Sequence, residues 1–531
     1  MDTGTQFRMR YVWTICLAAA LGGLLFGYDW VVIGGAEPFY EAHFQLRTPF
    51  EEGWAMSCAL VGCLIGALIS GGLSDRFGRK RLLILAGVLF LATGIGTALA
   101  PSFARFVVFR LLGGMGIGLA SNISPMYIAE VSPAKMRGRL VSLNQLAIVI
   151  GILIAQFVNY LIGAHGSAVD EGRVAAAVQS SARAESPQAV REFIAKYGWK
   201  IKPEVVDEFL AEQGEMPQSA AVVKFMAKHE LTVEKTAVEV ARHGLVPWNE
   251  EHGWRWMFGA GTLPAILFFV AMFAVPESPR WLVKNGKTPQ ARTILGRIGG
   301  PAHADSEIMQ IEGTLVNETE QVHFRELLDP RMLKILLLGV VLAVFQQWCG
   351  INVIFNYAKK IFEAAGYGVS DILMNIVITG TVNLAFTFVA IFTVDRLGRR
   401  SLMLFGAAGL AVIYALIGAS YFFGSQGEHV LLLVVLAIAC YACTLAPVTW
   451  VVLSEIYPNR IRGAAMSVSV FALWTACFVL TMTFPILKEA LGAAGTFWIY
   501  GGICILGFVF IKFRLPETKG KSLEEIEREL T

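Results

Sequence analysis

One charged signature occurs twice in this chain, each time between two long apolar segments. The first copy is Gly-Gly-Leu-Ser-Asp-Arg-Phe-Gly-Arg-Lys-Arg at 71–81, and the second is Thr-Val-Asp-Arg-Leu-Gly-Arg-Arg at 393–400. Further matched residues follow in the same order, namely Glu130 and Arg137 with Glu455 and Arg462, and Glu277 with Glu517. The pattern indicates a duplicated membrane protein with two matching halves, an arrangement found in many secondary transporters.

The spacing between matching residues locates an insertion in the first half. The two signature aspartates are 320 residues apart and the first pair of glutamates 325, but Glu277 and Glu517 are only 240 apart. The polar stretch 165–253 has about the missing length. We expect it to form short amphipathic helices, such as Pro203–Glu212 and Val233–Arg242. It is either a small lid or partner-binding subdomain, or an elaboration that only stabilises the protein.

The composition favours a membrane protein over a soluble one. Only 16% of the 531 residues are charged, against about 25% in soluble domains. The net charge of +3 does not suggest a nucleic-acid partner. All eight cysteines lie in apolar segments, so we expect neither a disulfide framework nor a metal site. The apolar run 11–36 is too long for a cleaved signal and is expected to be the first membrane helix.

About twelve segments are long and apolar enough to span a bilayer, which needs about 20 residues each. The sequence therefore predicts an all-α membrane protein with two pseudo-symmetric six-helix bundles. The expected helices are 11–36, 54–73, 82–100, 103–128, 141–163 and 255–275, then 333–358, 370–393, 401–423, 429–453, 463–487 and 494–514. The expected parts are helices 1–5 in 1–164, the insertion in 165–253, helix 6 in 254–276, a linker in 277–332, helices 7–12 in 333–514 and a tail in 515–531.

The positive charges predict the orientation in the membrane. Lys and Arg crowd the second, fourth, eighth and tenth connections, while the odd-numbered short connections carry fewer of them. Such residues favour the cytoplasmic side. We therefore expect both termini, the even connections and the linker to be cytoplasmic, and the insertion to face outside.

Asp29 lies inside the first predicted span, where a charge costs roughly 2.5–3.5 kcal/mol and usually marks function. Arg110 on helix 4 is at a matching depth, since both residues lie about 10–12 Å below the outer end at 1.5 Å per residue. Pairing with Arg favours the charged carboxylate, and isolation in an apolar site favours the protonated acid. Such a pair is either a proton-coupling device or a permanent ion pair that only stabilises.

The duplicated signature predicts a charged network on the cytoplasmic face. Asp75 and Asp395 are placed to sit at helix N-termini, and the arginines are placed to pair with Glu130 and Glu455. We expect the network to hold the outward-open state and to break when the halves rock, unless the charges serve topology alone. Its expected members are Asp75, Arg79, Glu130, Arg137, Glu277, Asp395, Arg399, Glu455, Arg462 and Glu517.

Neutral polar side chains in the predicted spans point to an uncharged substrate. Gln346, Gln347 and Asn352 cluster on helix 7 near mid-depth. Amides hydrogen-bond hydroxyl groups in both directions, whereas a polar residue on a membrane helix otherwise usually joins helices. Further amides and aromatic faces come from Gln145, Gln156, Asn356, Asn383, Trp450 and Trp474.

These residues resemble the sugar porter family of the major facilitator superfamily, and within it the bacterial D-xylose–proton symporters. The resemblance covers both halves but not about 165–253. It rests on Gly-Arg-Lys-Arg at 78–81, Pro-Glu-Ser-Pro-Arg at 276–280, Gln-Gln-Trp-Cys-Gly-Ile-Asn at 346–352 and Pro-Glu-Thr-Lys-Gly at 516–520.

The resemblance implies the major facilitator fold and a role for several residues. It makes Asp29 the protonated acid and Arg110 its partner. It places the sugar against Gln145, Gln346, Gln347, Asn352, Asn383 and Trp450, with Trp474 also kept. The chain departs from the family where Ile152 replaces an amide, Asn356 replaces a tyrosine, and Leu473 and Cys477 replace amides on helix 11. Helix 11 would therefore offer fewer hydrogen bonds, which leaves the identity of the sugar open.

We expect a proton-coupled monosaccharide symporter of the bacterial inner membrane, with D-xylose as first choice of substrate and D-glucose as second. It is expected to be a monomer, driven by the proton gradient without a cofactor. A uniporter of the same fold and a non-transporting sugar sensor remain alternatives, and a polyol or drug is a lesser option. No nucleophile–base set, nucleotide loop or metal cluster suggests an enzyme.

Overall fold

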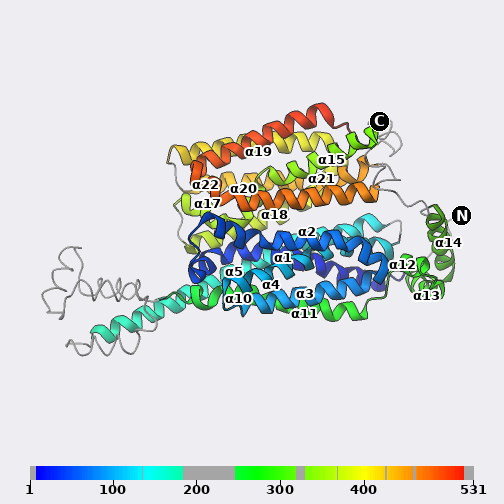
Figure 1. The fold of residues 1–531 in the computed structure, drawn as a ribbon, viewed down its shortest axis with the longest axis horizontal. Helices are drawn as coiled ribbons and strands as arrows, with labels where there is room; N and C mark the ends of the chain where they lie inside the picture. The colour runs from blue at the N-terminus through cyan, green and yellow to red at the C-terminus, as the bar shows by residue number, and fades with distance from the viewer. Residues whose placement is uncertain are drawn as a thin grey trace. The chain divides into compact units, whose positions relative to one another are not determined.

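The computed structural model describes residues 7–133, 136–182, 246–317, 329–366, 369–424, 427–457 and 462–519. Every regular element within these ranges is a helix (Figure 1). The chain divides into two compact units. The first unit comprises Met1–Glu37, Phe44–Tyr160 and Met257–Thr531, and the second comprises Pro38–His43 and Leu161–Trp256.

The six helices expected in the first half are present. The chain forms α1 Met9–Phe44, α2 Pro49–Phe77, α3 Arg79–Ala98, α4 Phe103–Val131 and α5 Arg137–Ala182, then η3 Asn249–Gly253, α10 Trp254–Ala260 and α11 Thr262–Ala274. Local sequence sets the boundaries. Thr48 caps α2 by accepting the Glu51 N–H at 3.2 Å, and Pro49 occupies the first helical position, where its missing N–H costs nothing.

The second half repeats this arrangement with more interruptions. Its helices are α15 Pro330–Trp348, α16 Ile351–Asn356, α17 Ala358–Ala364, α18 Val369–Leu397, α19 Arg399–Phe422, α20 Glu428–Cys443, α21 Leu445–Ile456 and α22 Arg462–Arg514. Expected helix 7 is broken at Gly350, which has φ 89°, and again at Tyr357. Expected helix 10 is broken at Thr444. Broken helices in transporters free backbone groups near the binding region.

Eleven helical stretches in the described ranges are long and apolar enough to cross a membrane. One of them, Ala464–Arg514, has 51 residues, more than twice the length that one span needs. Gly492 interrupts it with φ 70°, so it supplies both expected helices 11 and 12. The protein is therefore a multi-pass membrane protein with the expected helices, while the domain boundaries drawn between them stay a prediction.

Small residues let the helices of the first half approach closely. Gly114 on α4 faces the carbonyl oxygen of Ala59 on α2, and Gly118 faces that of Cys63 one turn further on. In lipid there is no hydrophobic force between helices, so association depends on such close backbone packing. This contact holds α4, which carries Arg110, against α2.

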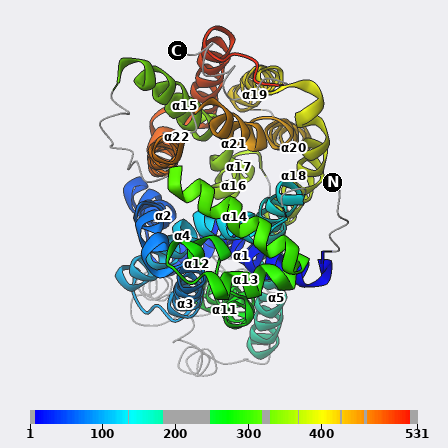
Figure 2. The ribbon, with the colours of Figure 1, turned by 90° about the vertical axis from the view of Figure 1, so that its right-hand side faces the viewer.

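The linker forms three short helices, α12 Pro279–Lys284, α13 Thr288–Gly299 and α14 Pro301–Asn317. Figures 1 and 2 show them gathered at one end of the helices of the first unit, which we call the linker end. The start of α1 lies at the same end, because the Arg8 N–H donates to the Ile298 carbonyl at 2.8 Å and the Phe7 ring meets His303. Phe7 and Arg8 therefore lie on the same side as α13 and α14.

The second unit contains the start of the expected insertion. Helix 5 was expected to end at 163, but α5 continues to Ala182, so the insertion begins as an extension of a membrane helix. Asp170 accepts the Trp248 N–H at 2.9 Å, and the Asn249 side chain donates to the Gly163 carbonyl at 2.9 Å. The expected helices Pro203–Glu212 and Val233–Arg242 lie outside the described residues.

Candidate functional site

Asp29 and Arg110 form the buried ion pair that the sequence predicts. The Arg110 Nη1 lies 2.8 Å from Asp29 Oδ1, and Nη2 donates to the Asp29 carbonyl at 3.3 Å. Asp29 is 8% exposed and Arg110 only 1%. Asp29 on α1 and Arg110 on α4, which the sequence places at matching depth, are therefore in direct contact.

The surroundings of the pair leave one carboxylate oxygen available. Asp29 Oδ2 has no hydrogen-bond partner among the described residues. The Arg110 guanidinium lies 5.4 Å from the centre of the Phe258 ring, and the neighbouring Tyr28 hydroxyl donates to the Met257 carbonyl at 2.8 Å. A proton on Oδ2 would neutralise the carboxylate and weaken the pair without first breaking another hydrogen bond.

The amides of helix 7 form a continuous hydrogen-bonded chain. Gln346 Nε2 donates to the Tyr441 hydroxyl, and Gln347 Nε2 donates to Gln346 Oε1 at 2.6 Å. Asn352 Nδ2 donates to Gln347 Oε1 and lies 3.6 Å from Cys477 Sγ. The bend at Gly350 lets α15 and α16 contribute to one chain. These amides hydrogen-bond one another. A sugar hydroxyl, which both donates and accepts, can take the place of one amide as the partner of another.

An aromatic cluster joins the two halves beside Asp29. The Trp474 ring on α22 lies 6.0 Å from Phe26 and 5.6 Å from Trp30 on α1. Trp474 Nε1 is buried and lacks a hydrogen-bond partner among the described residues. Sequence reasoning singled out Trp474 but missed both α1 aromatics, although Phe26 and Trp30 flank Asp29 within one turn.

The other polar and aromatic residues singled out in the predicted spans lie on α5, α16, α18 and α21. Gln145 on α5 is exposed, Trp450 on α21 is 39% exposed, and Asn383 on α18 is buried. Gln156 and Asn356 are buried with side-chain atoms that lack a hydrogen-bond partner within the described part of the chain. The structure thus assembles Gln346, Gln347 and Asn352 directly, whereas the sugar-binding role of every member stays a prediction.

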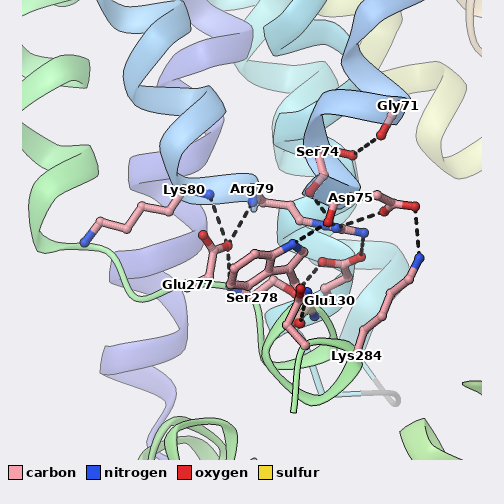
Figure 3. A network of polar contacts seen from close by, with 11 residues as sticks. Gly71, Ser74, Asp75, Arg79, Lys80, Glu130, Glu277, Ser278 and Lys284 are labelled. Atoms are coloured by element: carbon pink, nitrogen blue, oxygen red, sulfur yellow. Dashed lines mark hydrogen bonds and ion pairs between the residues drawn. The ribbon is translucent and has the colours of Figure 1, made fainter. Parts of the chain in front are cut away.

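The first signature copy forms a network at the linker end. Figure 3 shows Arg79 between Asp75 and Glu130, at 3.2 and 3.0 Å. The second Glu130 oxygen accepts the Ser278 hydroxyl. Glu277 accepts the backbone N–H groups of Arg79 and Lys80 at 2.9 and 3.1 Å. The loop after α11 is thereby tied to the ends of α2, α3 and α4.

The second copy repeats these contacts. Arg399 Nη2 lies 3.0 Å from Glu455 Oε1, and the Thr518 hydroxyl donates to Glu455 Oε2 at 2.6 Å. Glu517 accepts the backbone N–H groups of Arg399 and Arg400 at 2.9 and 3.2 Å. Matching roles for Glu277 and Glu517 explain why the Pro-Glu motifs accompany the signature in both halves.

The placement of the signature aspartates at helix N-termini was wrong. Asp75 lies in the last turn of α2 and Asp395 near the end of α18. Glu277 and Glu517 occupy the N-termini of α3 and α19 instead, where an anion is favoured. Lys284 pairs with Asp75 at 2.9 Å, so a cation from the linker offsets a carboxylate at a helix C-terminus.

The sequence predicts one charged network on the cytoplasmic face, whereas the ion pairs of the two arginines among the described residues form separately within each half. Arg79 pairs with Glu130 within the first half, and Arg399 pairs with Glu455 within the second. Arg137 is exposed at the start of α5, and the side chains of Arg462 and Asp395 lie outside the described part of the structure. In this structure each network clamps the helix ends of its own half, and the gating role stays a prediction.

The glycine between α18 and α19 provides a stability test. Gly398 has φ 88°, and a Cβ there would lie 2.7 Å from Glu517 Oε2. We expect Gly398→Ala to destabilise the protein by about 1–3 kcal/mol, because alanine is strained at positive φ and displaces the carboxylate. The thermal unfolding temperature in detergent measures this. Gly502→Ala is the control, since no described atom of a neighbouring residue lies within 4 Å of a Cβ added there. Equal melting temperatures for both variants would contradict the expectation.

The two halves also meet away from the linker end. The Ser57 hydroxyl on α2 lies 3.4 Å from Met482 Sδ on α22, and the Trp54 ring packs edge-on against Phe478. Lys360 on α17 also pairs with Glu52 on α2. α17 also lies at this end, opposite α12–α14 in Figure 1, and we call it the far end. The halves are closed against each other there.

Comparisons with known proteins agree over nearly the whole chain. The family model described as "Sugar (and other) transporter" matches residues 15–182 and 239–530. The arabinose-proton symporter of Bacillus subtilis is 34% identical over 98% of this chain and 95% of that protein. The D-xylose-proton symporter of Escherichia coli K12 is 34% identical over 98% of this chain and 96% of that protein.

A solved structure shows the same fold. The inward open conformation of the xylose transporter XylE from E. coli matches with a TM-score of 0.73 and 33% identity, over 98% of this chain and 100% of that chain. The repeated signature, the two six-helix halves and these matches lead to one assignment. The chain belongs to the sugar porter family of the major facilitator superfamily, and it is a multi-pass sugar transporter and not an enzyme.

Proposed function

We propose that the protein is a proton-coupled symporter that imports a neutral monosaccharide, with D-xylose as the first candidate and D-glucose as the second. The observation that carries the proposal is the buried Asp29–Arg110 pair, in which one carboxylate oxygen has no hydrogen-bond partner among the described residues. The matched relatives named for arabinose–proton and D-xylose–proton symport support the same reading. The relative from Synechocystis is named a glucose transport protein, which keeps glucose as the second candidate.

The proposed cycle uses the two halves as moving bodies. Deprotonated Asp29 pairs with Arg110, and protonation from outside neutralises the carboxylate and favours the outward-facing, sugar-accepting state. The sugar binds between the halves against Gln346, Gln347 and Asn352. Proton release inside restores the ion pair and resets the protein. The contact between the halves at the far end and the likeness to the inward open transporter support a state in which the central site is open toward the linker end.

The setting of the transporter is part of the proposal. We place it in a bacterial inner membrane with both termini and the linker in the cytoplasm, as the positive charges favour. It acts as a monomer in the lipid bilayer, and the proton gradient takes the place of a cofactor. Asp75 and Asp395 with their partners would gate the cytoplasmic side.

Uptake into proteoliposomes tests the proposal. Labelled D-xylose and D-glucose are supplied with an inward proton gradient, with and without a protonophore. We expect accumulation above the external concentration that the protonophore abolishes. Equal flux with and without the gradient would instead establish a uniporter, and sugar binding without flux would establish a sensor.

A further inference from the structure

A second buried ion cluster joins the two halves at the far end. Lys360 on α17 lies 3.4 Å from Glu37 Oε1 on α1 and also pairs with Glu52 Oε2 on α2. Glu37 is fully buried and Lys360 is 9% exposed. Neither the duplicated signature nor the Asp29 pair includes these residues.

The cluster is anchored firmly in the second half. The Lys360 ammonium lies 5.6 Å from the centre of the Tyr357 ring, and the Tyr357 hydroxyl donates to the Thr481 carbonyl at 2.8 Å. Lys488 on α22 donates to the Lys360 carbonyl at 3.4 Å. The Lys360 ammonium from the second half thus pairs with two carboxylates from the first, and the Lys488 ammonium holds the Lys360 backbone.

The elements that carry the cluster also carry the transport residues. Glu37 follows Asp29 by eight residues on α1, about 12 Å along the helix axis. Lys360 follows Asn352 and Asn356 on the outer part of broken helix 7. Gly34 of α1 packs against this segment, since a Cβ there would lie 2.7 Å from the Phe355 carbonyl oxygen. The proton-bearing helix and the sugar-bearing segment therefore touch and are joined by charge.

We propose that Lys360 is a positioning residue of the transport cycle, which fastens the sugar-bearing segment α16–α17 to Glu37 on the helix that bears Asp29. The proposal rests on the proposed sugar transport. Closure buries Glu37 and Lys360, half-buries Glu52 and is stabilised by their pairing. Loss of the ammonium leaves the buried Glu37 carboxylate beside that of Glu52 without the Lys360 charge, and opening the far end lets water reach it. Removing Lys360 thus shifts the protein toward the state that is open at the far end.

The experiment measures far-end opening directly. Ser57→Cys places a thiol at the α2–α22 contact, where it is covered when the far end is closed. Its labelling by a membrane-impermeant maleimide from that side is measured in proteoliposomes, relative to the parent with its native cysteines. We expect Lys360→Met and Glu37→Gln each to raise the labelling rate about tenfold, within the usual range of coupling between sites. Lys360→Arg should restore the rate.

Two further variants separate a specific role from general damage. Lys359→Met removes a neighbouring ammonium that pairs with Glu363 at 3.7 Å and acts on Glu37 without a direct ion pair, so labelling should rise much less than in Lys360→Met. The double variant Lys360→Met/Glu37→Gln leaves fewer unpaired charges. The double variant should fold well. Its labelling rate should be about that of each single variant, because both substitutions remove the same Lys360–Glu37 interaction.

Transport by the same variants provides the second reading. We expect the maximal rate of sugar uptake to fall about tenfold in Lys360→Met, with external sugar binding retained. Unchanged labelling in Lys360→Met and Glu37→Gln, with wild-type transport intact, would overturn the role of Lys360 and leave the proposed function standing. Absence of sugar flux in the wild type would overturn the proposed function instead.

Discussion

Replacing Asp29 with asparagine is expected to abolish gradient-driven sugar accumulation and to leave sugar exchange across the membrane. Asparagine keeps the shape of the side chain but can no longer alternate between a charged and a neutral form. A gradient of one pH unit supports about tenfold accumulation at one proton per sugar, and the ratio should fall to one in the variant. Labelled D-xylose in proteoliposomes measures both accumulation and exchange.

A matched control guards this result against a loss of fold. Asp371→Asn removes an exposed carboxylate near the start of α18 and should accumulate sugar as the wild type does. Arg110 loses its partner in Asp29→Asn, and leaving a buried charge unpaired costs about 3–5 kcal/mol. Retained exchange shows that the variant still folds. Accumulation at the wild-type level in Asp29→Asn would reduce the ion pair to a structural role.

Replacing Gln347 with alanine is expected to weaken sugar binding about 10- to 100-fold. Gln347 is the central amide of the chain, because it donates to Gln346 and accepts from Asn352. Its loss would remove the proposed bond to the sugar and leave both neighbours without their Gln347 partner, at a cost of about 1–3 kcal/mol. The KM for exchange should rise more than the maximal rate falls.

The control for Gln347 is an amide that joins helices within one half. Asn122 on α4 donates to the Ser70 hydroxyl on α2 at 2.9 Å. Asn122→Ala should lower stability somewhat and leave the KM unchanged. A similar KM change in both variants would show that Gln347 acts through the fold, and an unchanged KM in Gln347→Ala would remove it from the sugar site.

The sequence predicted those contacts that depend on helix depth and on the repeat. Counting residues along two antiparallel spans brought Asp29 to Arg110, and the duplicated order brought Arg79 to Glu130 and Arg399 to Glu455. These inferences succeed because a membrane helix has a fixed rise and a fixed direction.

The failures arise where a chain changes direction over one or two residues. Asp75 and Gly78 are only three residues apart, yet α2 ends between them and α3 begins after the glycine. Which acid meets the new N-terminus then depends on a loop 198 residues away, where Glu277 bonds the Arg79 N–H. Hydropathy does not encode that placement.

The Lys360 cluster was missed for a different reason. In the sequence, Lys360 lies in an odd-numbered short connection, whose charges indicate only the orientation of the helices, and Glu37 directly follows the first predicted span. Only the break at Tyr357, which continues helix 7 as α17, turns Lys360 toward α1. Tyr441 was missed likewise, as one aromatic residue in an apolar helix.

Sugar-driven proton movement tests the central claim most directly. D-xylose, and separately D-glucose, is added to lightly buffered, de-energised cells that contain the protein, and the external pH is followed. We predict a transient rise in pH as protons enter with the accepted sugar, absent in Asp29→Asn and in cells treated with a protonophore. Entry of labelled sugar with no change in external pH would contradict proton coupling.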